Sequence, residues 1–262
     1  MKAVLRPILS PLQHIGSIVW LGIDTFLETT EAMLHGRAPF RAALFFEQTD
    51  RTGVGSVPLI SMVSFFLGLT MALLTGYELR KFGTENLVPG LVAVGFSREL
   101  GPLMTGIMMA ARIGAAFTAE LGTMTVNEEV EAIEAMGIGP LRFLLTPRVL
   151  AVFLLMPCLN VVSNLSALLG AALVCNMKFS IALSYFNDLV LHDLIERDVV
   201  SGTIKSLLFG LIIGLISCYK GLSVTGGAAG VGTSTTSSVV TAITVVIAAD
   251  TIFNIGMVAL YG

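Results

Sequence analysis

Long apolar stretches separated by short polar segments make up most of the chain. The first runs from Val54 to Tyr77 without a charged residue, which is long enough to cross a bilayer as one helix. Four comparable stretches follow it. We therefore predict five membrane-spanning helices, over residues 54–77, 87–111, 149–177, 200–219 and 237–261. The fold class that this pattern indicates is an all-α integral membrane protein with a five-span domain over residues 54–262.

The segment before the first span has a different pattern. Over residues 15–35 apolar residues recur at helical spacing, and Asp24, Glu28 and Glu31 occupy other faces. This pattern predicts an amphipathic helix that lies in the membrane interface without crossing it. Together with the polar linker that follows, this helix forms a separate N-terminal region over residues 1–53.

The apolar stretch from Leu87 to Gly122 is too long for a single crossing. A helix of this length measures about 54 Å, against a hydrocarbon core of roughly 30 Å. We place the second span at residues 87–111 and expect a kink at Pro102, because proline removes a backbone hydrogen bond. Small residues at every fourth position predict close helix packing. They are Gly106, Ala110, Gly114, Thr118 and Gly122.

Three segments between the spans have patterns of their own. Residues 127–137 and 179–198 alternate apolar and polar residues at helical spacing, which predicts a short helix in each. Thr125 or Asn127 can cap the first of these helices. Residues 221–236 are rich in glycine, and we expect a flexible turn there that leads into the fifth span.

Lysine and arginine residues predict the orientation of the chain. The segment before the first span carries five of them, whereas the loop after it carries only Arg80 and Lys81. The positive-inside rule then places the N-terminus in the cytoplasm and, after five spans, the C-terminus outside. It follows that the short helix at residues 127–137 is cytoplasmic and the one at residues 179–198 external.

The composition supports a membrane location. Hydrophobic residues make up 55% of the 262 residues and charged residues 13%, about half the share that is usual in soluble domains. A net charge of −3 gives no reason to expect binding to nucleic acid. The three cysteines lie in apolar stretches, so we predict buried thiols, and the three isolated histidines predict no metal site.

Four charged residues nevertheless interrupt the predicted spans: Arg98, Glu99, Lys205 and Asp250. They fall at overlapping depths in the outer half of the membrane, where each charge costs about 2.5–3.5 kcal/mol near a helix centre. Because two are positive and two negative, we expect them to face the interior and to pair in one network. Either this network only fixes helix packing, or it borders a cavity for a substrate with a charged headgroup. Buried ion pairs stabilise proteins poorly, which favours the cavity.

The predicted cytoplasmic helix at residues 127–137 is acidic. Four glutamates surround its apolar residues, and Gly137 follows as a stop signal. It is either a solvated acidic helix or a helix that docks into a partner protein. The chain contains no Gly-Lys-Ser/Thr triplet and hence no P-loop, and it lacks the nucleophile motif of a hydrolase. We therefore do not predict an enzyme.

Two segments carry a resemblance to a known family. The first runs from Arg98 to Ala151, RELGPLMTGIMMAARIGAAFTAELGTMTVNEEVEAIEAMGIGPLRFLLTPRVLA, and closely resembles the signature region of MlaE-type permeases of lipid-transporting ABC systems. The second, from Lys205 to Asn254, resembles the C-terminal signature of the same family. The resemblance covers residues 54–262 and is looser in the N-terminal helix. The charged positions show no departure from the family pattern.

The resemblance implies a homodimeric transmembrane half of a transporter. This transporter would move phospholipid between the inner and outer membranes of a diderm bacterium and so maintain the lipid asymmetry of the outer membrane. A separate ATPase dimer would bind ATP and magnesium, so no cofactor is expected in this chain. A ring of MCE-domain lipid-binding subunits is the second expected partner, and a small STAS-domain protein is a further candidate. The expected location is the bacterial inner membrane.

The resemblance also implies roles for individual residues. A lipid cavity between the two protomers would be bordered by Arg98, Glu99, Lys205, Asp250 and Tyr77. The helix that couples to the ATPase would use Glu128, Glu129, Glu131, Glu134, Met136 and Gly137. The alternative function is a non-transporting membrane scaffold, in which the charges are structural. The direction of transport and the preferred lipid are open at this point.

Overall fold

The computed structural model describes residues 42–261. All regular structure in this part of the chain is helical, and five helices are long and apolar enough to cross a membrane. The predicted fold class, an all-α membrane protein with five spans, is confirmed. The amphipathic helix predicted at residues 15–35 lies outside the described residues, and the domain boundary predicted after residue 53 stays a prediction.

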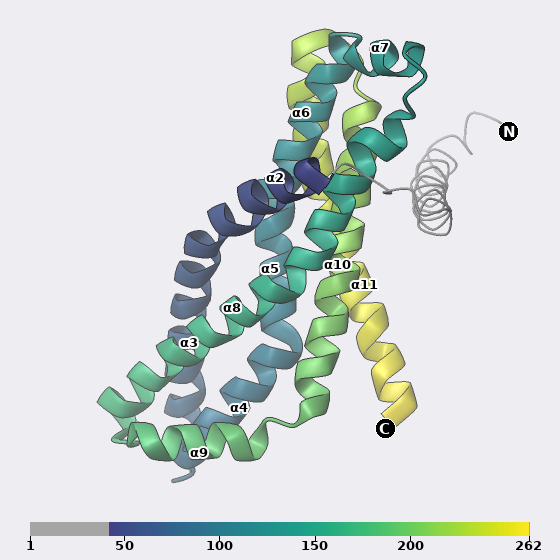
Figure 1. Ribbon diagram of the computed structural model, residues 1–262. Coiled ribbons are helices and arrows are strands. Elements are labelled where there is room, and N and C mark those ends of the chain that lie inside the picture. Colours follow the sequence, from purple (N-terminus) through teal and green to yellow (C-terminus); the bar gives the residue numbers. More distant parts are fainter. Residues whose placement is uncertain (1–41, 262) are drawn as a thin grey trace, which may run out of the picture. The chain divides into compact units, whose positions relative to one another are not determined.

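Figure 1 shows the helices and their labels. In chain order they are α2 (Ala42–Gly53), α3 (Val57–Arg80), α4 (Val88–Gly95), α5 (Gly101–Met109), α6 (Ala115–Val126), α7 (Glu129–Ala135), α8 (Thr146–Phe179), α9 (Leu183–Asp193), α10 (Glu196–Leu222) and α11 (Gly227–Tyr261). Local sequence explains several ends. For example, α3 has a proline in its first turn, where no backbone donor is needed, and Arg80 in its last turn, where a cation suits the helix dipole.

The spanning helices extend beyond the predicted spans. They cover Gln48–Arg80, Glu85–Val126, Phe143–Phe179, Glu196–Leu222 and Gly227–Ala259. The backbone hydrogen bonds of a helix close within the helix itself, so it continues into polar flanking sequence until turn residues stop it. Hydropathy alone therefore underestimates the length of such helices.

The fifth spanning helix corrects one expectation. The flexible turn expected over residues 221–236 is wrong for most of that segment, because α11 begins at Gly227. Alanine favours helix there, and threonine hydroxyls bond back to the helix itself; that of Thr235 donates to a carbonyl one turn earlier at 2.7 Å. The turn is confined to the few residues between α10 and α11, and Gly226 and the first residue of α11, Gly227, have positive φ.

The second span is a helix with two wider turns. Helices α4, α5 and α6 follow one another and are joined by the π-helical turns Phe96–Leu100 and Ala110–Gly114. The first turn stands just before Pro102, whose ring would crowd the carbonyl of Arg98 in a regular α-helix. The wider turn relieves this conflict. The helix then continues past the predicted end of the second span to Val126.

The described chain forms two compact units. The first unit contains residues 42–50, 110–152 and 211–244, and the second contains residues 51–109, 153–210 and 245–261. Helices α8, α10 and α11 therefore contribute one part of their length to each unit. Each unit has its own core.

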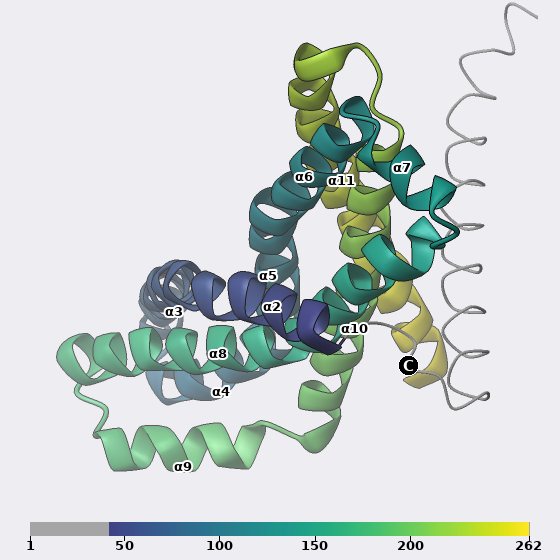
Figure 2. The ribbon, with the colours of Figure 1, turned by 45° about the horizontal axis from the view of Figure 1, so that its top comes forward.

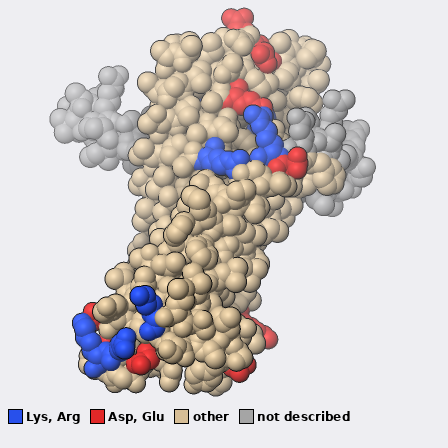
Figure 3. All heavy atoms as spheres, turned by 90° about the vertical axis from the view of Figure 1, so that its left-hand side faces the viewer, with Lys and Arg blue, Asp and Glu red and all other residues tan. Residues whose placement is uncertain are grey.

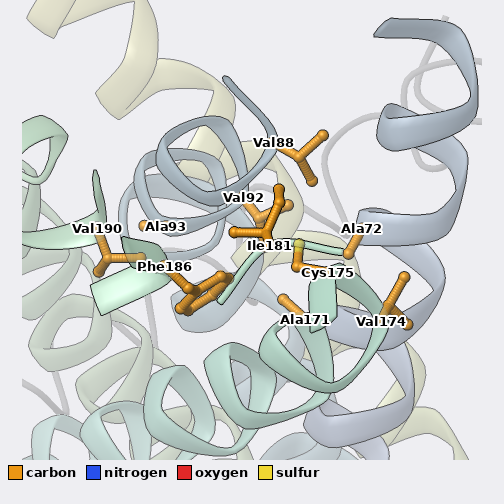
Figure 4. Packing of buried hydrophobic residues seen from close by; sticks show 10 residues of the cluster. All are labelled: Ala72, Val88, Val92, Ala93, Ala171, Val174, Cys175, Ile181, Phe186 and Val190. Carbon is orange, nitrogen blue, oxygen red and sulfur yellow. The ribbon is translucent and has the colours of Figure 1, made fainter. Parts of the chain in front are cut away.

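The core of the second unit lies between α3, α4, α8 and α9. Figure 4 shows its buried side chains: Ala72, Val88, Val92, Ala93, Ala171, Val174, Cys175, Ile181, Phe186 and Val190. Helix α9 lies within the segment for which a short helix was predicted, and it packs along α4 (Figure 2). Helices α3 and α8 touch at backbone level, since a Cβ at Gly68 would lie 2.0 Å from the carbonyl oxygen of Ala167.

The core of the first unit lies between α6, α8 and α10. Its buried residues are Leu121, Leu144, Leu145, Val149 and Cys218, and Val130 and Ile133 of α7 pack against them. The close packing predicted for the small residues is confirmed here. A Cβ at Gly114 would lie 3.1 Å from the hydroxyl of Ser217, and one at Gly122 would lie 2.8 Å from a methyl group of Val224.

A group of hydroxyls, which we call the hydroxyl junction, joins three helices of the first unit. The hydroxyl of Thr118 on α6 lies 2.8 Å from Ser238 Oγ on α11 and 3.1 Å from the carbonyl oxygen of Ser217 on α10. All three residues are fully buried. Neutral hydrogen bonds therefore hold the second, fourth and fifth spans together in this unit.

The surface of the protein suits contact with lipid. In the view of Figure 3 the charged side chains form separate groups, and most of the remaining surface is uncharged. Large apolar side chains on α3, such as Met62, Phe66 and Leu74, are more than half exposed, which is unusual in contact with water. Cys158 on α8 is also exposed, so the predicted burial of all three thiols is wrong for this one. Its side of α8 faces away from the packed helices.

Candidate functional site

Three of the four charged residues predicted to pair do meet inside the second unit. Lys205 on α10 is fully buried. Its ammonium group donates to Glu99 Oε2 at 2.7 Å and lies 3.0 Å from Asp250 Oδ1. Glu99 belongs to the π-helical turn before α5, and Asp250 belongs to α11. The second, fourth and fifth spans thus each contribute one charge.

Asn254 completes this group, which we call the charge network. It lies one turn after Asp250 on α11, and its side-chain oxygen accepts a hydrogen bond from Lys205 at 2.6 Å. Its amide nitrogen donates to Glu99 Oε2 at 3.0 Å and to Asp250 Oδ2 at 3.3 Å. The amide therefore serves both carboxylates. Sequence reasoning missed this residue because it carries no charge, although its spacing of four from Asp250 was a readable signal.

The charge network is buried on one side and accessible on the other. The ring of Phe253 lies 5.5 Å from the ammonium group of Lys205, close enough for a cation–π contact. The side chain of Asp250 is mostly buried, whereas that of Glu99 is 36% exposed. The network holds one cation and two carboxylates, and Glu99 is the most exposed of these three charged side chains.

Arg98 does not join the network. Its guanidinium lies 4.0 Å from Asp198 Oδ1, in the first turn of α10, and its side chain is 41% exposed. Arg98 and Glu99 are consecutive residues of the π-helical turn and their side chains point in different directions, so that Glu99 meets Lys205 whereas Arg98 meets Asp198. The predicted network of four charges is wrong in this respect. Asp198 was overlooked because the fourth span was expected to begin only at residue 200.

Tyr77, the remaining residue expected at the cavity, lies near the end of α3 and is 70% exposed. Within the described part of the chain, no hydrogen bond or ion pair connects Tyr77 to the charge network. Its expected role stays a prediction.

The predicted docking segment contains the short helix α7. Gly137 follows it with φ of +75° and donates a backbone hydrogen bond to Glu134 at 2.9 Å, so the predicted stop is present. The predicted cap is wrong. Helix α6 extends to Val126, which leaves Thr125 inside that helix, and Glu128 in a left-handed conformation precedes α7 instead.

One face of α7 is packed against the first unit and the other is exposed. Its apolar residues pack on the core of the first unit, as described above. The four glutamates expected to couple, Glu128, Glu129, Glu131 and Glu134, are exposed, and Met136 beside them is 66% exposed. An acidic face with an exposed apolar side chain suits a partner that presents basic and apolar groups.

An ion pair lies at the base of the hairpin that carries α7. Arg148 on α8 is buried, donates to Glu120 Oε1 on α6 at 2.9 Å and to the carbonyl oxygen of Leu144 at 2.8 Å, and its guanidinium lies 6.0 Å from the ring centre of Phe117. This pair fixes α6 against α8 and so holds the two ends of the segment that contains α7. Sequence reasoning did not connect these two charges, because 28 residues separate them.

The described residues contain no group of three or more histidine, cysteine, aspartate or glutamate side chains that could hold a metal ion.

Comparison with known proteins shows the family. The model of the family described as "Permease MlaE" matches residues 45–255. This match covers most of the chain and includes the charge network and α7.

Individual relatives agree with this family. A protein of Rickettsia felis called "Probable ABC transporter permease protein" is 37% identical over 78% of this chain and 79% of its own length. A probable ABC transporter permease protein of Synechocystis sp. is 34% identical over 84% of each chain. A third relative, "Protein TRIGALACTOSYLDIACYLGLYCEROL 1, chloroplastic" of Arabidopsis thaliana, is 35% identical over 90% of this chain and 68% of its own.

Proposed function

Because the chain belongs to the MlaE permease family, we propose that it is the membrane subunit of an ABC transporter that moves phospholipid between the inner and outer membranes. The names of the relatives support the coarser part of this proposal, a transporter permease. The name of the Arabidopsis relative includes that of a diacylglycerol lipid. This supports a lipid with two acyl chains as the substrate class.

The observation that carries the proposal is the partly exposed carboxylate of the charge network. Glu99 is accessible, yet it is held by two buried or half-buried donors on other helices, Lys205 and Asn254. A group fixed in this way keeps its position without reorganising when a ligand arrives. It offers a polar contact beside apolar helices, which is what a lipid with a headgroup and two tails requires.

The neighbouring charge fits the same ligand. Arg98 precedes Glu99 in the chain, is also partly exposed and carries the opposite sign. In this proposal the guanidinium attracts the phosphate of a headgroup, while the carboxylate attracts a headgroup amine. The apolar flanking helices take the acyl chains. Asp198 holds Arg98 in place through their ion pair.

Movement of lipid against a gradient needs an energy source that this chain lacks. The sequence contains no P-loop, and family membership implies an ATPase partner. We propose that the exposed acidic face of α7 docks into that ATPase, which binds ATP and magnesium. A second copy of the chain, a ring of MCE-domain subunits and a small STAS-domain protein complete the proposed assembly. It would lie in the bacterial inner membrane with the N-terminus in the cytoplasm.

Transport by a Glu99 variant tests the substrate proposal. The chain is reconstituted with its ATPase in vesicles that contain labelled phospholipid, and ATP-dependent lipid transfer is measured. Glu99→Gln keeps the shape but removes the charge, so we expect transfer to fall about tenfold, as for the loss of one charge-assisted hydrogen bond. Glu78→Gln, in an exposed ion pair with Lys81, is the matched control. Parental transfer by Glu99→Gln, or a chain that purifies without any ATPase, would instead favour the scaffold alternative.

Charge reversal on α7 tests the docking proposal. Replacing Glu131 and Glu134 together by lysine presents a positive face to a surface that we expect to be basic, so the amount of co-purified ATPase should fall severalfold. The fold should survive, because both side chains are exposed. Glu78→Lys, on an exposed carboxylate of α3, serves as the control. Undiminished ATPase in the double variant would place the docking surface elsewhere.

A further inference from the structure

A polar cavity lies between the end of α10 and the first turns of α11, within the first unit. Its volume is about 310 Å³, and it is lined by Tyr219, Lys220, Ser223, Thr233, Ser234 and Ser237. Lysine and tyrosine at the end of a spanning helix are typical of the membrane–water interface. The charge network and α7 contribute no residue to this cavity.

Among the residues that line this cavity, Lys220 is the one that carries a charge. Its ammonium group donates to Ser237 Oγ at 3.1 Å, and within the described part of the chain no carboxylate pairs with it. Lys81 differs in this respect, since it pairs with Glu78 at 2.8 Å. An ammonium group has three hydrogens to donate, so Lys220 keeps further donors for a ligand.

Two serines add donors beside Lys220. Within the described part of the chain, the hydroxyl hydrogens of Ser234 and Ser237 have no acceptor, whereas the hydroxyls of Ser223 and Thr233 donate to carbonyls of their own chain segment at 2.7 and 3.0 Å. The cavity therefore presents one cation and two hydroxyl donors, and no carboxylate lines it. This combination suits the oxygens of a phosphate group.

A second cavity continues from the first. It is a groove of about 690 Å³ lined by Ala229, Gly232, Thr233, Thr236, Ser237 and Val240, and it shares Thr233 and Ser237 with the polar cavity. The hydroxyl of Thr236 bonds to a carbonyl of its own helix at 3.2 Å, as that of Thr233 does at 3.0 Å. These residues consequently present mainly carbon to the groove.

We propose that the two joined cavities bind a membrane lipid that carries a phosphate group. The phosphate lies between Lys220, Ser234 and Ser237, and an acyl chain lies in the groove beside Gly232 and Val240. A free phosphate ion fits the polar cavity equally well, but it leaves the adjoining apolar groove unexplained. Both hollows are open to the surface of the protein, so a ligand can enter them. The site is distinct from the charge network and does not depend on which molecule is transported.

Two variants test the phosphate contact and the acyl-chain groove separately. Lys220→Gln removes the charge that binds phosphate. Gly232→Leu fills the groove, and it does so without disturbing the fold, because a Cβ at Gly232 meets nothing within 4 Å and leucine favours helix more than glycine. The matched controls are Lys178→Gln, an exposed lysine on α8, and Gly256→Leu, an equally open glycine on α11.

Native mass spectrometry of the purified full-length protein measures the binding. Phosphatidylglycerol is titrated onto delipidated parent and variants, with diacylglycerol of the same chains and inorganic phosphate as the other probes. We expect the parent to bind one more tight phosphatidylglycerol per chain than either Lys220→Gln or Gly232→Leu, whose affinity should be about tenfold lower. Both controls should match the parent. Diacylglycerol should bind weakly, and inorganic phosphate should not displace the lipid.

Three results would overturn the proposal. The first is equal phosphatidylglycerol binding by the parent and Lys220→Gln. The second is displacement by inorganic phosphate together with an unaffected Gly232→Leu, which would assign the cavity to the free ion. The third is a change of oligomeric state in Gly232→Leu, measured by mass photometry, which would assign the groove to a contact between copies. None of these results bears on transport, which is measured separately.

Discussion

The same three spans are joined twice, once in each unit, by different chemistry. In the first unit the hydroxyl junction uses Thr118 and two serines, all neutral and fully buried. In the second unit the charge network uses Lys205 between two carboxylates, with an asparagine beside them. The second, fourth and fifth spans contribute to both. The hydroxyl junction therefore shows how these three helices pack when no charge is involved, and the charge network can be compared with it.

The comparison shows that charges are not needed to hold these helices together. Hydroxyl groups make the contacts of the hydroxyl junction at 2.8 and 3.1 Å without a charge. The buried ion pair of the first unit, Arg148 with Glu120, joins α6 to α8 and does not connect these three spans to one another. Each charge near the centre of a membrane helix costs about 2.5–3.5 kcal/mol on the lenient scale, and buried ion pairs seldom offset their desolvation. The hydroxyl junction is also closed, whereas the charge network is open at Glu99, which is 36% exposed. Both differences favour a functional role for the network.

The largest effect is expected when the network loses its only cation. Lys205→Ala leaves Glu99 and Asp250 facing each other without a counter-charge, so the free energy of unfolding in detergent should fall by about 3 kcal/mol. This figure is at the low end for a broken buried pair, because the side chain of Glu99 is partly exposed. Lipid transfer should be abolished. Unfolding curves and transfer assays on the same preparation provide the check, and an unchanged stability would contradict the pairing seen here.

A double variant sharpens this result. Asp250→Ala alone strands Lys205 with one carboxylate, whereas Lys205→Ala combined with Asp250→Ala removes a cation and an anion together. The double change should therefore be less destabilising than the sum of the two single changes. Transfer should stay low in all three variants if the network contacts the headgroup. Transfer that recovers in proportion to stability would show instead that the network only supports the fold.

The spans could be predicted from the sequence because each depends on its own residues. An apolar stretch such as 54–77 predicts a membrane-spanning helix whatever the rest of the chain contains. The first and last residues of the spanning helices were harder to predict. Residues 227–236 have the composition of a loop, but their hydroxyls bond back within the helix, so α11 starts ten residues before the predicted span.

The partners within the site could be predicted only in part. Depth along the spans brought Glu99, Lys205 and Asp250 together correctly. It could not give the rotation of each helix, and the π-helical turn at Phe96–Leu100 adds a further change of direction. Arg98 consequently meets Asp198 and not Lys205. Asn254 was not predicted, because the prediction considered charged residues alone, although Asn254 contacts every other member of the network.

The smallest effect is expected at the hydroxyl junction, and it completes the comparison. Thr118→Val keeps the shape of the side chain but removes the hydroxyl that meets Ser217 and Ser238, so unfolding should become easier by about 1 kcal/mol. No charge is stranded, and the hydroxyl of Ser238 can turn to another acceptor. Lipid transfer per folded molecule should equal that of the parent. The contrary result is that Thr118→Val impairs lipid transfer as strongly as Lys205→Ala despite this small loss of stability. The hydroxyl junction and the charge network would then have the same role, and the charges would not be specifically required for transfer.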